Sequence, residues 1–275
     1  MRPDFGRARR AANAATRAVL SPAAARGVAL ECAWIGAHLT TYPLGLLRDR
    51  LPAESSRLSL EGLDPIRRGL LVGDVEAAGT PILMVHGIVD NHSIFTVLRR
   101  ALRRRGFARV AAVGYGWLAT DLRSLAARLG SHVEEICDRT GYDRVRIVAH
   151  SMGGLVARYY VQRLGGDRRV HTLVTLGTPH AGTRWARLLP HPLLRQLRPD
   201  SGFLAELAAP VPRCSTRFLV VWSDMDQVIV PREHARLVHP DLDVREIPVR
   251  GVGHLSLPVD RRVVHQICSM FADVT

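Results

Sequence analysis

Short apolar runs alternate with amphipathic stretches from about residue 81 to the end of the chain. Between the runs, apolar residues recur at helical spacing, as in 121–138, 154–164 and 259–271. Strands separated by helices predict an α/β fold, a mostly parallel sheet with helices on both faces. A chain of 275 residues is long enough for one such domain. The runs predicted as strands are 82–86, 110–115, 145–149, 171–176, 217–222 and 244–249.

Residues 181–213 interrupt this alternation with several prolines and short helical pieces. An insertion at this point of the sheet would lie over the carboxyl ends of the strands, where open α/β folds bind ligands. The segment is therefore predicted to be a helical, lid-like insertion; a plain surface connection is the alternative. The leucines of this segment suggest an apolar ligand such as an acyl group, although leucines in any packed helix have the same spacing. These apolar residues are Leu188, Leu189, Leu193, Leu194, Leu197, Phe203, Leu204 and Leu207.

The N-terminal part, residues 1–65, begins with several arginines and continues into an apolar stretch at 28–47. This stretch is about long enough to span a bilayer, but it contains Glu31, His38 and Pro43, and a Glu in lipid is costly. We expect a helical extension that packs on the domain or lies at a membrane surface. A spanning or exported segment stays open, so the expected location is cytoplasmic or membrane-associated, with export as the alternative.

The formal net charge is +13, and all 38 basic residues are Arg. The arginines are spread along the chain, whereas nucleic-acid binders usually show blocks of mixed Lys and Arg, so no nucleic-acid partner is expected. A positive surface can still attract anionic lipid. The cysteines form no CxxC pair, which argues against structural zinc, and disulfides stay open. Cys137 and Cys268 lie in apolar-periodic stretches and are predicted to be core residues.

The sharpest chemical signal is VRIVAHSMGG at 145–154, in which an apolar strand leads through a Ser into a helix. This is the context of a nucleophile elbow, so Ser151 is the predicted nucleophile. Small residues are needed two positions before and after the Ser, and Ala149 and Gly153 occupy those positions. The following helix begins near Met152, whose backbone N–H is placed to stabilise a developing oxyanion.

The chain resembles bacterial lipases of the α/β-hydrolase superfamily, including the branch with Ala-His-Ser-x-Gly. The resemblance covers about residues 70–272 and includes PILMVHGIVDN at 81–91, LGTPHAGT at 176–183 and GVGHLSLP at 251–258. It implies a hydrolase domain over residues 66–275 and a second oxyanion donor, the backbone N–H of Ile88. His86 is expected to hold that loop rather than act as a base. Ala149 departs slightly from the usual Gly, and residues 1–65 match no family.

The resemblance also implies a triad in the order Ser, acid, His. His254, between glycines and the last helix, is the predicted general base, and His265 is expected to be structural. His180 comes too early to be the base and is expected to brace its loop, with substrate contact as the alternative. The acid follows the strand 217–222, where the resemblance favours Asp226 over Asp224. Whichever of these two aspartates is not the acid is expected to be a turn or cap residue.

Together these residues predict a serine carboxylic-ester hydrolase, a triacylglycerol lipase or carboxylesterase that acts through an acyl-enzyme on lipid-like esters. No metal or organic cofactor is expected. An acyltransferase or a deacylase of lipid-anchored proteins has the same motifs and stays an alternative. A non-enzymatic, membrane-associated protein of this fold is the third possibility, although it would be expected to lose a triad residue.

Overall fold

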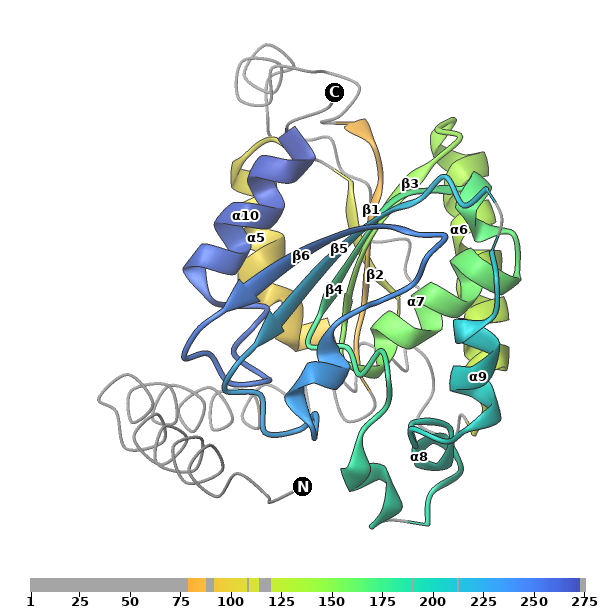
Figure 1. Cartoon of the computed structure of the whole chain (residues 1–275). Coiled ribbons are helices and arrows are strands. Elements are labelled where there is room, and N and C mark those ends of the chain that lie inside the picture. The colour runs from red at the N-terminus through yellow and green to blue at the C-terminus, as the bar shows by residue number, and fades with distance from the viewer. Residues whose placement is uncertain are drawn as a thin grey trace, which may run out of the picture.

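Six strands form a parallel sheet at the centre of the structure, which is a computed structural model. The structure describes residues 79–87, 92–107, 109–113, 120–188, 190–211 and 213–272. The strand order is β2-β1-β3-β4-β5-β6, and each described pair of neighbours is parallel. The predicted parallel α/β architecture is therefore confirmed (Figure 1). The strands are β1 (Ile82–Val85), β2 (Val110–Val113), β3 (Val145–His150), β4 (Val170–Leu176), β5 (Arg217–Ser223) and β6 (Asp243–Val249).

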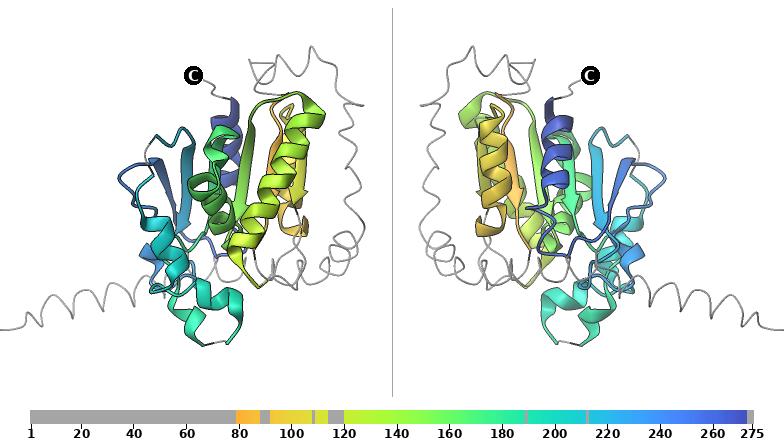
Figure 2. Two further views of the ribbon diagram at one scale, coloured as in Figure 1. Left: turned by 90° about the vertical axis from the view of Figure 1, so that its right-hand side faces the viewer. Right: turned by 90° about the vertical axis from the view of Figure 1, so that its left-hand side faces the viewer.

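Two pairs of helices cover the two faces of the sheet (Figure 2). On one face lie α5 (Thr96–Arg104), which continues from η1 (His92–Phe95), and α10 (Arg261–Ala272). On the other lie α6 (Leu122–Thr140) and α7 (Met152–Arg163). The 3-10 turns η2 (Gly166–Arg168) and η4 (Arg232–Ala235) complete the connections.

The core has two halves because successive side chains of a strand point to opposite faces of the sheet. In β1, Leu83 and Val85 pack with α6 and α7, whereas Ile82 and Met84 pack with α5 and α10. Cys137 and Cys268, predicted to be core residues, are buried in the first and second half respectively, and both are free thiols. Both faces of the sheet are thus buried, which explains why its central strands read as continuous apolar runs.

Helix α6 shows how the local sequence sets the ends of an element. Asp121 is its N-cap, and its carboxylate accepts hydrogen bonds from the backbone N–H and the hydroxyl of Ser124, both at 3.0 Å. The helix ends at Gly141, which adopts the left-handed conformation with φ of 73°. The sequence predicted a helix over 121–138, and the structure extends it to Thr140.

The segment 181–213 contains η3 (Arg184–Arg187), α8 (Pro192–Gln196) and α9 (Gly202–Ala208). The side-chain amide of Gln196 accepts from Leu122 N at 3.0 Å and donates to Thr120 O at 3.0 Å, which ties α8 to the start of α6. The ring of Phe203 stacks on Tyr159 of α7 with centroids 5.1 Å apart. Much of the segment therefore packs beside α6 and α7 (Figure 1), and its role as a lid stays a prediction. Its apolar residues Leu193, Leu197, Phe203, Leu204 and Leu207 belong to the core.

The predicted N-terminal extension, residues 1–65, lies outside the described residues, and so does the apolar stretch 28–47. Among the helices that the structure describes, none is long and apolar enough to cross a bilayer.

Arg158 of α7 is 3% exposed and connects three parts of the domain. Its guanidinium donates to Gln162 Oε1 at 2.5 Å, to His180 O at 3.2 Å and to Leu207 O at 2.9 Å. These acceptors lie in α7, in the loop after β4 and in α9. All of them are neutral, and burial together with the positive charge of Arg163 lowers the pKa of Arg158. Neutral acceptors thus satisfy this buried cation, and it joins α9 to the sheet side of the domain.

Replacing this guanidinium should destabilise the domain strongly. Arg158→Met leaves the carbonyl of His180 and the amide oxygen of Gln162 buried without this donor, so the free energy of unfolding should fall by roughly 2 to 4 kcal/mol. Urea denaturation followed by circular dichroism measures the change. Arg128→Met, at an exposed position of α6, is the control and should change stability by less than about 0.5 kcal/mol. Equal stability of the two variants would contradict the role given to Arg158.

Candidate active site

Ser151 occupies a sharp turn between β3 and α7, with φ of 54° and ψ of −130°. A positive φ is strained for a residue with a side chain, so neighbouring groups must hold it. Ser151 N donates to Leu176 O at 2.9 Å, and Ser151 O accepts from Thr178 Oγ1 at 2.9 Å and from Gly154 N at 3.0 Å. These bonds fix the turn to the end of β4. The structure therefore gives Ser151 the backbone conformation expected of a nucleophile elbow.

The space around this turn depends on small residues. Ala149 is fully buried, in agreement with the need for a small side chain there. At Gly154 a Cβ would lie 1.9 Å from Thr178 Oγ1, the hydroxyl that bonds to Ser151 O. The sequence analysis named Gly153 and did not single out Gly154. Only the contact with Thr178, 24 residues further along the chain, reveals this requirement.

Met152, the predicted oxyanion donor, is the first residue of α7. The first N–H groups of a helix have no acceptor within the helix and lie at the positive end of its dipole, which suits an oxyanion. The other predicted donor, Ile88, lies outside the described residues. The two residues before it are described: His86 Nδ1 lies 2.9 Å from Gly87 O. This contact agrees with a His86 that holds the loop.

Asp226 and His254 form a buried pair, 6% and 3% exposed. His254 Nδ1 lies 2.7 Å from Asp226 Oδ2, and Asp226 Oδ1 accepts from Val228 N at 2.9 Å and from Ile229 N at 3.0 Å. Burial alone would raise the pKa of Asp226, but His254 and the two amides lower it below its usual value. An ionised Asp226 accepts the Nδ1 proton of His254, which leaves Nε2 unprotonated, the state that a general base needs.

Asp224, the alternative acid, has a different role in the structure. Its Oδ1 accepts from Gly251 N at 2.8 Å, and its carbonyl accepts from Arg232 at 3.0 Å. It therefore fastens the turn that precedes His254, as expected of the residue not used as the acid. The geometry favours Asp226 as the acid.

The pair lies beside the elbow, at the edge of the sheet where the parallel strands end. At Gly177, the residue after β4, a Cβ would lie 3.1 Å from both Asp226 Oδ2 and His254 Nδ1. Gly177 follows Leu176, which accepts the Ser151 amide. The rings of His150 and His254 lie 4.8 Å apart between centroids, and His150 Nε2 lies 3.1 Å from His254 O. The sequence analysis missed the roles of Gly177 and His150, which depend on contacts between distant segments.

The other histidines considered are placed as supports. His180 is buried, with Nε2 3.0 Å from Thr175 Oγ1, the contact of a residue that braces its loop. Burial lowers the pKa of its imidazole well below 6.5, and the charge of Arg158 lowers it further. His265 lies 2.9 Å from the Arg105 guanidinium and connects α10 to the end of α5. Within the described ranges, no group of three or more His, Cys, Asp or Glu side chains is arranged to hold a metal ion.

Comparison with solved structures identifies the fold. A mature Bacillus licheniformis lipase, BlEst2, superposes with a TM-score of 0.59 at 18% identity, over 72% of this chain and 93% of that one. The product of the Listeria innocua gene lin2722 superposes with a TM-score of 0.57 at 16% identity, over 71% and 95% of the two chains. The chain has the α/β-hydrolase fold.

Sequence comparisons connect this α/β-hydrolase with two kinds of enzyme. The family model for palmitoyl protein thioesterase matches residues 81–204. A triacylglycerol lipase of Pseudarthrobacter phenanthrenivorans is 26% identical over 113 residues, 38% of this chain and 35% of the lipase. A palmitoyl-protein thioesterase-dolichyl pyrophosphate phosphatase fusion of Schizosaccharomyces pombe is 26% identical over 141 residues, 48% of this chain and 22% of the fusion. The chain thus matches only about a third or less of the length of these relatives.

His180 should make the α/β-hydrolase domain sensitive to mild acid. Because its folded pKa is depressed, only the unfolded chain takes up this proton between pH 6.5 and the folded pKa. The His180 contribution to unfolding free energy should therefore fall by about 1.4 kcal/mol between pH 7.5 and pH 5.5. His180→Gln, which keeps a polar group near Thr175, should lose this component in urea titrations at both pH values. His132→Gln, at a half-buried position of α6, is the control and should retain the wild-type pH dependence; the same dependence in His180→Gln would refute the assignment.

Proposed function

We propose that this chain is a serine hydrolase that cleaves carboxylic esters of lipid-like acyl groups, with Ser151, His254 and Asp226 as its catalytic triad. The observation that carries the proposal is the buried Asp226–His254 hydrogen bond of 2.7 Å beside the strained turn of Ser151. A nucleophile at a strained turn, a histidine and a carboxylate that orients it are the parts of a serine hydrolase.

In the proposed mechanism, Ser151 Oγ attacks the ester carbonyl while His254 Nε2 takes the hydroxyl proton. The tetrahedral oxyanion accepts hydrogen bonds from the backbone N–H of Met152 and, on the basis of the sequence resemblance, of Ile88. His254 then gives its proton to the leaving alcohol, and the C–O bond breaks. Water, deprotonated by His254, attacks the acyl-enzyme and releases the acid and free Ser151. Asp226 holds the imidazole and stabilises its charged form throughout.

Exposed apolar side chains near the pair support an acyl substrate. Trp185 of η3 is 53% exposed, and its indole N–H donates to Gln227 O at 3.0 Å, next to Asp226. Val228, whose amide binds Asp226, is 46% exposed. Large apolar side chains that remain exposed beside a site often contact an apolar ligand. They favour a lipid-like acyl group over a small polar one.

Thioester cleavage is the second candidate function. It is favoured by the match to the palmitoyl protein thioesterase family model over residues 81–204, a range that includes Ser151. The same triad can attack either an oxygen ester or a thioester, since the leaving group differs and the acyl transfer to Ser does not. Under this candidate the substrate would be a lipid-anchored protein, and an acyltransferase would differ only in the acceptor that takes the place of water.

The deciding experiment compares p-nitrophenyl esters of short to long acyl chains with a palmitoyl thioester. We expect hydrolysis by the wild type, loss of at least about 10³-fold in kcat for Ser151→Ala, and loss of roughly 10³-fold or more for Asp226→Asn. The ratio of kcat/KM between oxygen ester and thioester separates the two candidates. The acyl-chain optimum separates esterase from lipase.

Asp224→Asn is the matched control for Asp226→Asn, because the two carboxylates lie two residues apart in one loop. It should lower kcat less than about tenfold, since Asp224 contacts a backbone amide and not the imidazole. Full activity of Ser151→Ala would refute the proposal. Inactivity of the wild type toward every ester and thioester would favour the acyltransferase or the non-enzymatic alternative.

His150 should act as a positioning residue for His254. Its Nε2 is placed to donate to His254 O, and the two residues lie on the β3 and β6 sides of the site. His150→Leu removes this donor, so kcat should fall roughly tenfold with little change in KM, because the misplaced base affects mainly the transition state. His150→Gln keeps an N–H donor and should restore most of kcat. If Gln and Leu are equally impaired, or if only KM changes, the positioning role is wrong.

A further inference from the structure

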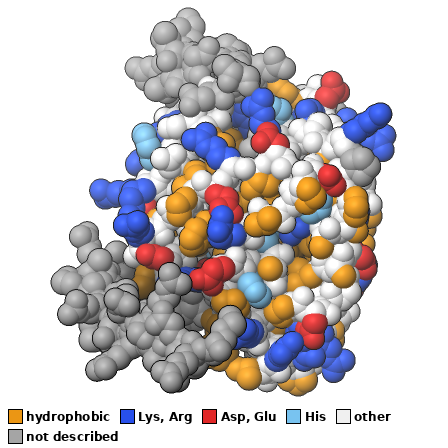
Figure 3. All heavy atoms as spheres, viewed as in Figure 1, with side chains coloured by type: hydrophobic (Ala, Val, Ile, Leu, Met, Phe, Trp, Pro, Cys, Tyr) orange, Lys and Arg blue, Asp and Glu red, His pale blue; other side chains and the backbone are white. Residues whose placement is uncertain are grey.

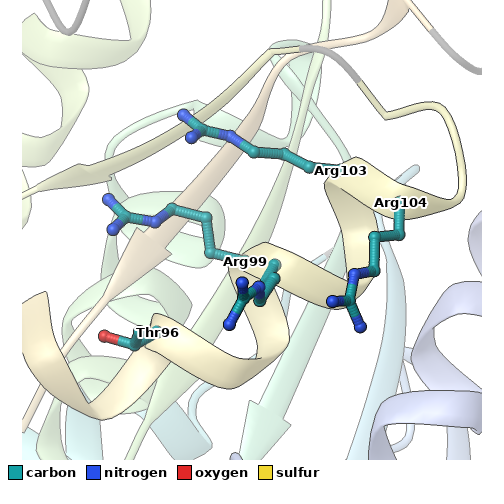
Figure 4. A pocket seen from close by; sticks show the side chains of 5 residues that line it. Thr96, Arg99, Arg103 and Arg104 are labelled. Atoms are coloured by element: carbon teal, nitrogen blue, oxygen red, sulfur yellow. The ribbon is translucent and has the colours of Figure 1, made fainter.

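Helix α5 presents a row of arginines to the outside of the domain. Its inward side chains Leu98 and Leu102 are fully buried in the sheet core. Its outer side borders a cavity of about 500 Å³ (Figure 4). Positions three, four and seven apart lie on one side of a helix, which brings these residues together. We call this surface the arginine face; it consists of Thr96, Arg99, Arg100, Arg103 and Arg104.

Three members of the arginine face gather positive charge on one side of α5. Arg100, Arg103 and Arg104 are exposed, and in the part of the chain that the structure describes they have no carboxylate partner. Helix α5 itself contains no acidic residue. Like charges three and four residues apart destabilise a helix by a few tenths of a kcal/mol per pair. A bound anion would remove this repulsion.

Several other arginines of the domain form ion pairs. Arg123 contacts Glu206 at 2.5 Å, and Arg169 contacts Glu134 at 2.7 Å. On the face seen in Figure 3, basic and acidic side chains are interspersed. The arginine face therefore stands out because four arginines and no acidic residue line one cavity in the described part of the chain. An exposed helix face that serves only solubility usually carries charges of both signs. The exposed side of α5 carries only positive ones.

We propose that the arginine face docks the protein on an anionic membrane surface. Guanidinium groups bind phosphate oxygens with two parallel hydrogen bonds, and a basic helix face is attracted to anionic headgroups. Val97, beside the arginines on α5, is 40% exposed and offers an apolar contact of the kind found in interfacial helices. No aromatic side chain lines the described part of the cavity, and such rings are what single-stranded nucleic acids stack on.

The position of α5 connects this surface with the proposed active site. The helix follows β1, whose carboxyl end lies at the same edge of the sheet as Ser151. Its nine residues extend from that edge along the sheet for about 13 Å. Docking through α5 would thus hold the catalytic edge close to the membrane in which lipid-like substrates lie. This inference extends the proposed function, and its test is independent of catalysis.

The test measures binding of the full chain, with Ser151→Ala so that no lipid is consumed, to vesicles of phosphatidylcholine with and without phosphatidylglycerol. The test variant is Arg100→Gln/Arg103→Gln/Arg104→Gln. We expect its apparent affinity for anionic vesicles to fall on the order of 100-fold, from three arginines near the surface. The binding should also weaken with salt. Circular dichroism and thermal unfolding check that the variant is folded.

The matched control is Arg128→Gln/Arg195→Gln/Arg245→Gln, which removes the same charge from exposed positions on α6, α8 and β6. It should lose less than about fivefold in affinity. Equal losses in both triple variants would mean that only net charge matters, and the inference would be overturned. It would also be overturned by wild-type binding that is as strong on neutral vesicles, by an unaffected test variant, or by tighter arginine-dependent binding of a single-stranded oligonucleotide.

Ester hydrolysis in solution keeps this inference separate from the proposed function. With Ser151 intact, the test variant should hydrolyse a soluble short-chain ester at the wild-type rate, because none of its three substitutions touches the site. If the wild type hydrolyses no ester and still binds anionic vesicles through α5, the proposed function fails and the docking surface stands. If it hydrolyses soluble esters and ignores vesicles, the reverse holds.

Discussion

The strained backbone of Ser151 is the constraint around which the site is arranged. A residue held at positive φ costs on the order of 1–3 kcal/mol, which the surrounding structure must offset. Here hydrogen bonds to the end of β4 hold the strained residue: Ser151 N donates to Leu176 O, and Thr178 Oγ1 donates to Ser151 O. The residue between them, Gly177, leaves the room that Asp226 and His254 occupy. The end of β4 therefore both holds Ser151 and leaves room for Asp226 and His254.

Two buried ionisable side chains show how the domain uses different solutions for charge. Asp226 is hydrogen-bonded to His254, which can carry a positive charge, and to two backbone amides. These groups lower the pKa of Asp226 although burial raises it. Arg158 has only neutral acceptors, and burial lowers its pKa. The first arrangement stabilises an ion that orients a base. The second joins α7 to α9 through directed hydrogen bonds, which fixes the position of the elbow helix.

Sequence patterns predicted the fold well because they report local periodicity. The six strands lie within two residues of their predicted bounds, and Asp121 caps α6 where the pattern began. The elbow was also readable, since strand, Ser and helix are contiguous at 145–164. The choice between Asp226 and Asp224 rested on a resemblance, because both follow β5. The contact between Asp226 and His254, 28 residues apart, favours Asp226, and such distant contacts also explain why Gly177 and His150 were missed.

The arginines of α5 form a surface cluster that their distribution along the sequence did not predict. Along the chain they are part of an even distribution of Arg, which argued against a nucleic-acid partner and pointed to no particular surface. The helix brings four of them beside one cavity, because residues three and four positions apart lie on the same side of a helix. The charge of a surface is therefore a property of the folded element and not of the composition.

The packing of residues 181–213 limits what a lid could be in this domain. A segment that opens must break few buried contacts, because each costs free energy on every cycle. Helix α9 contributes three side chains to the core, and Glu206 accepts hydrogen bonds from both Arg123 and Tyr159. In contrast, Trp185 and Leu188 around η3 are largely exposed. Helix α9 is therefore held in place, and within residues 181–213 a covering motion would be confined to the short region of η3, where exposed Trp185 bonds to the loop of Asp226.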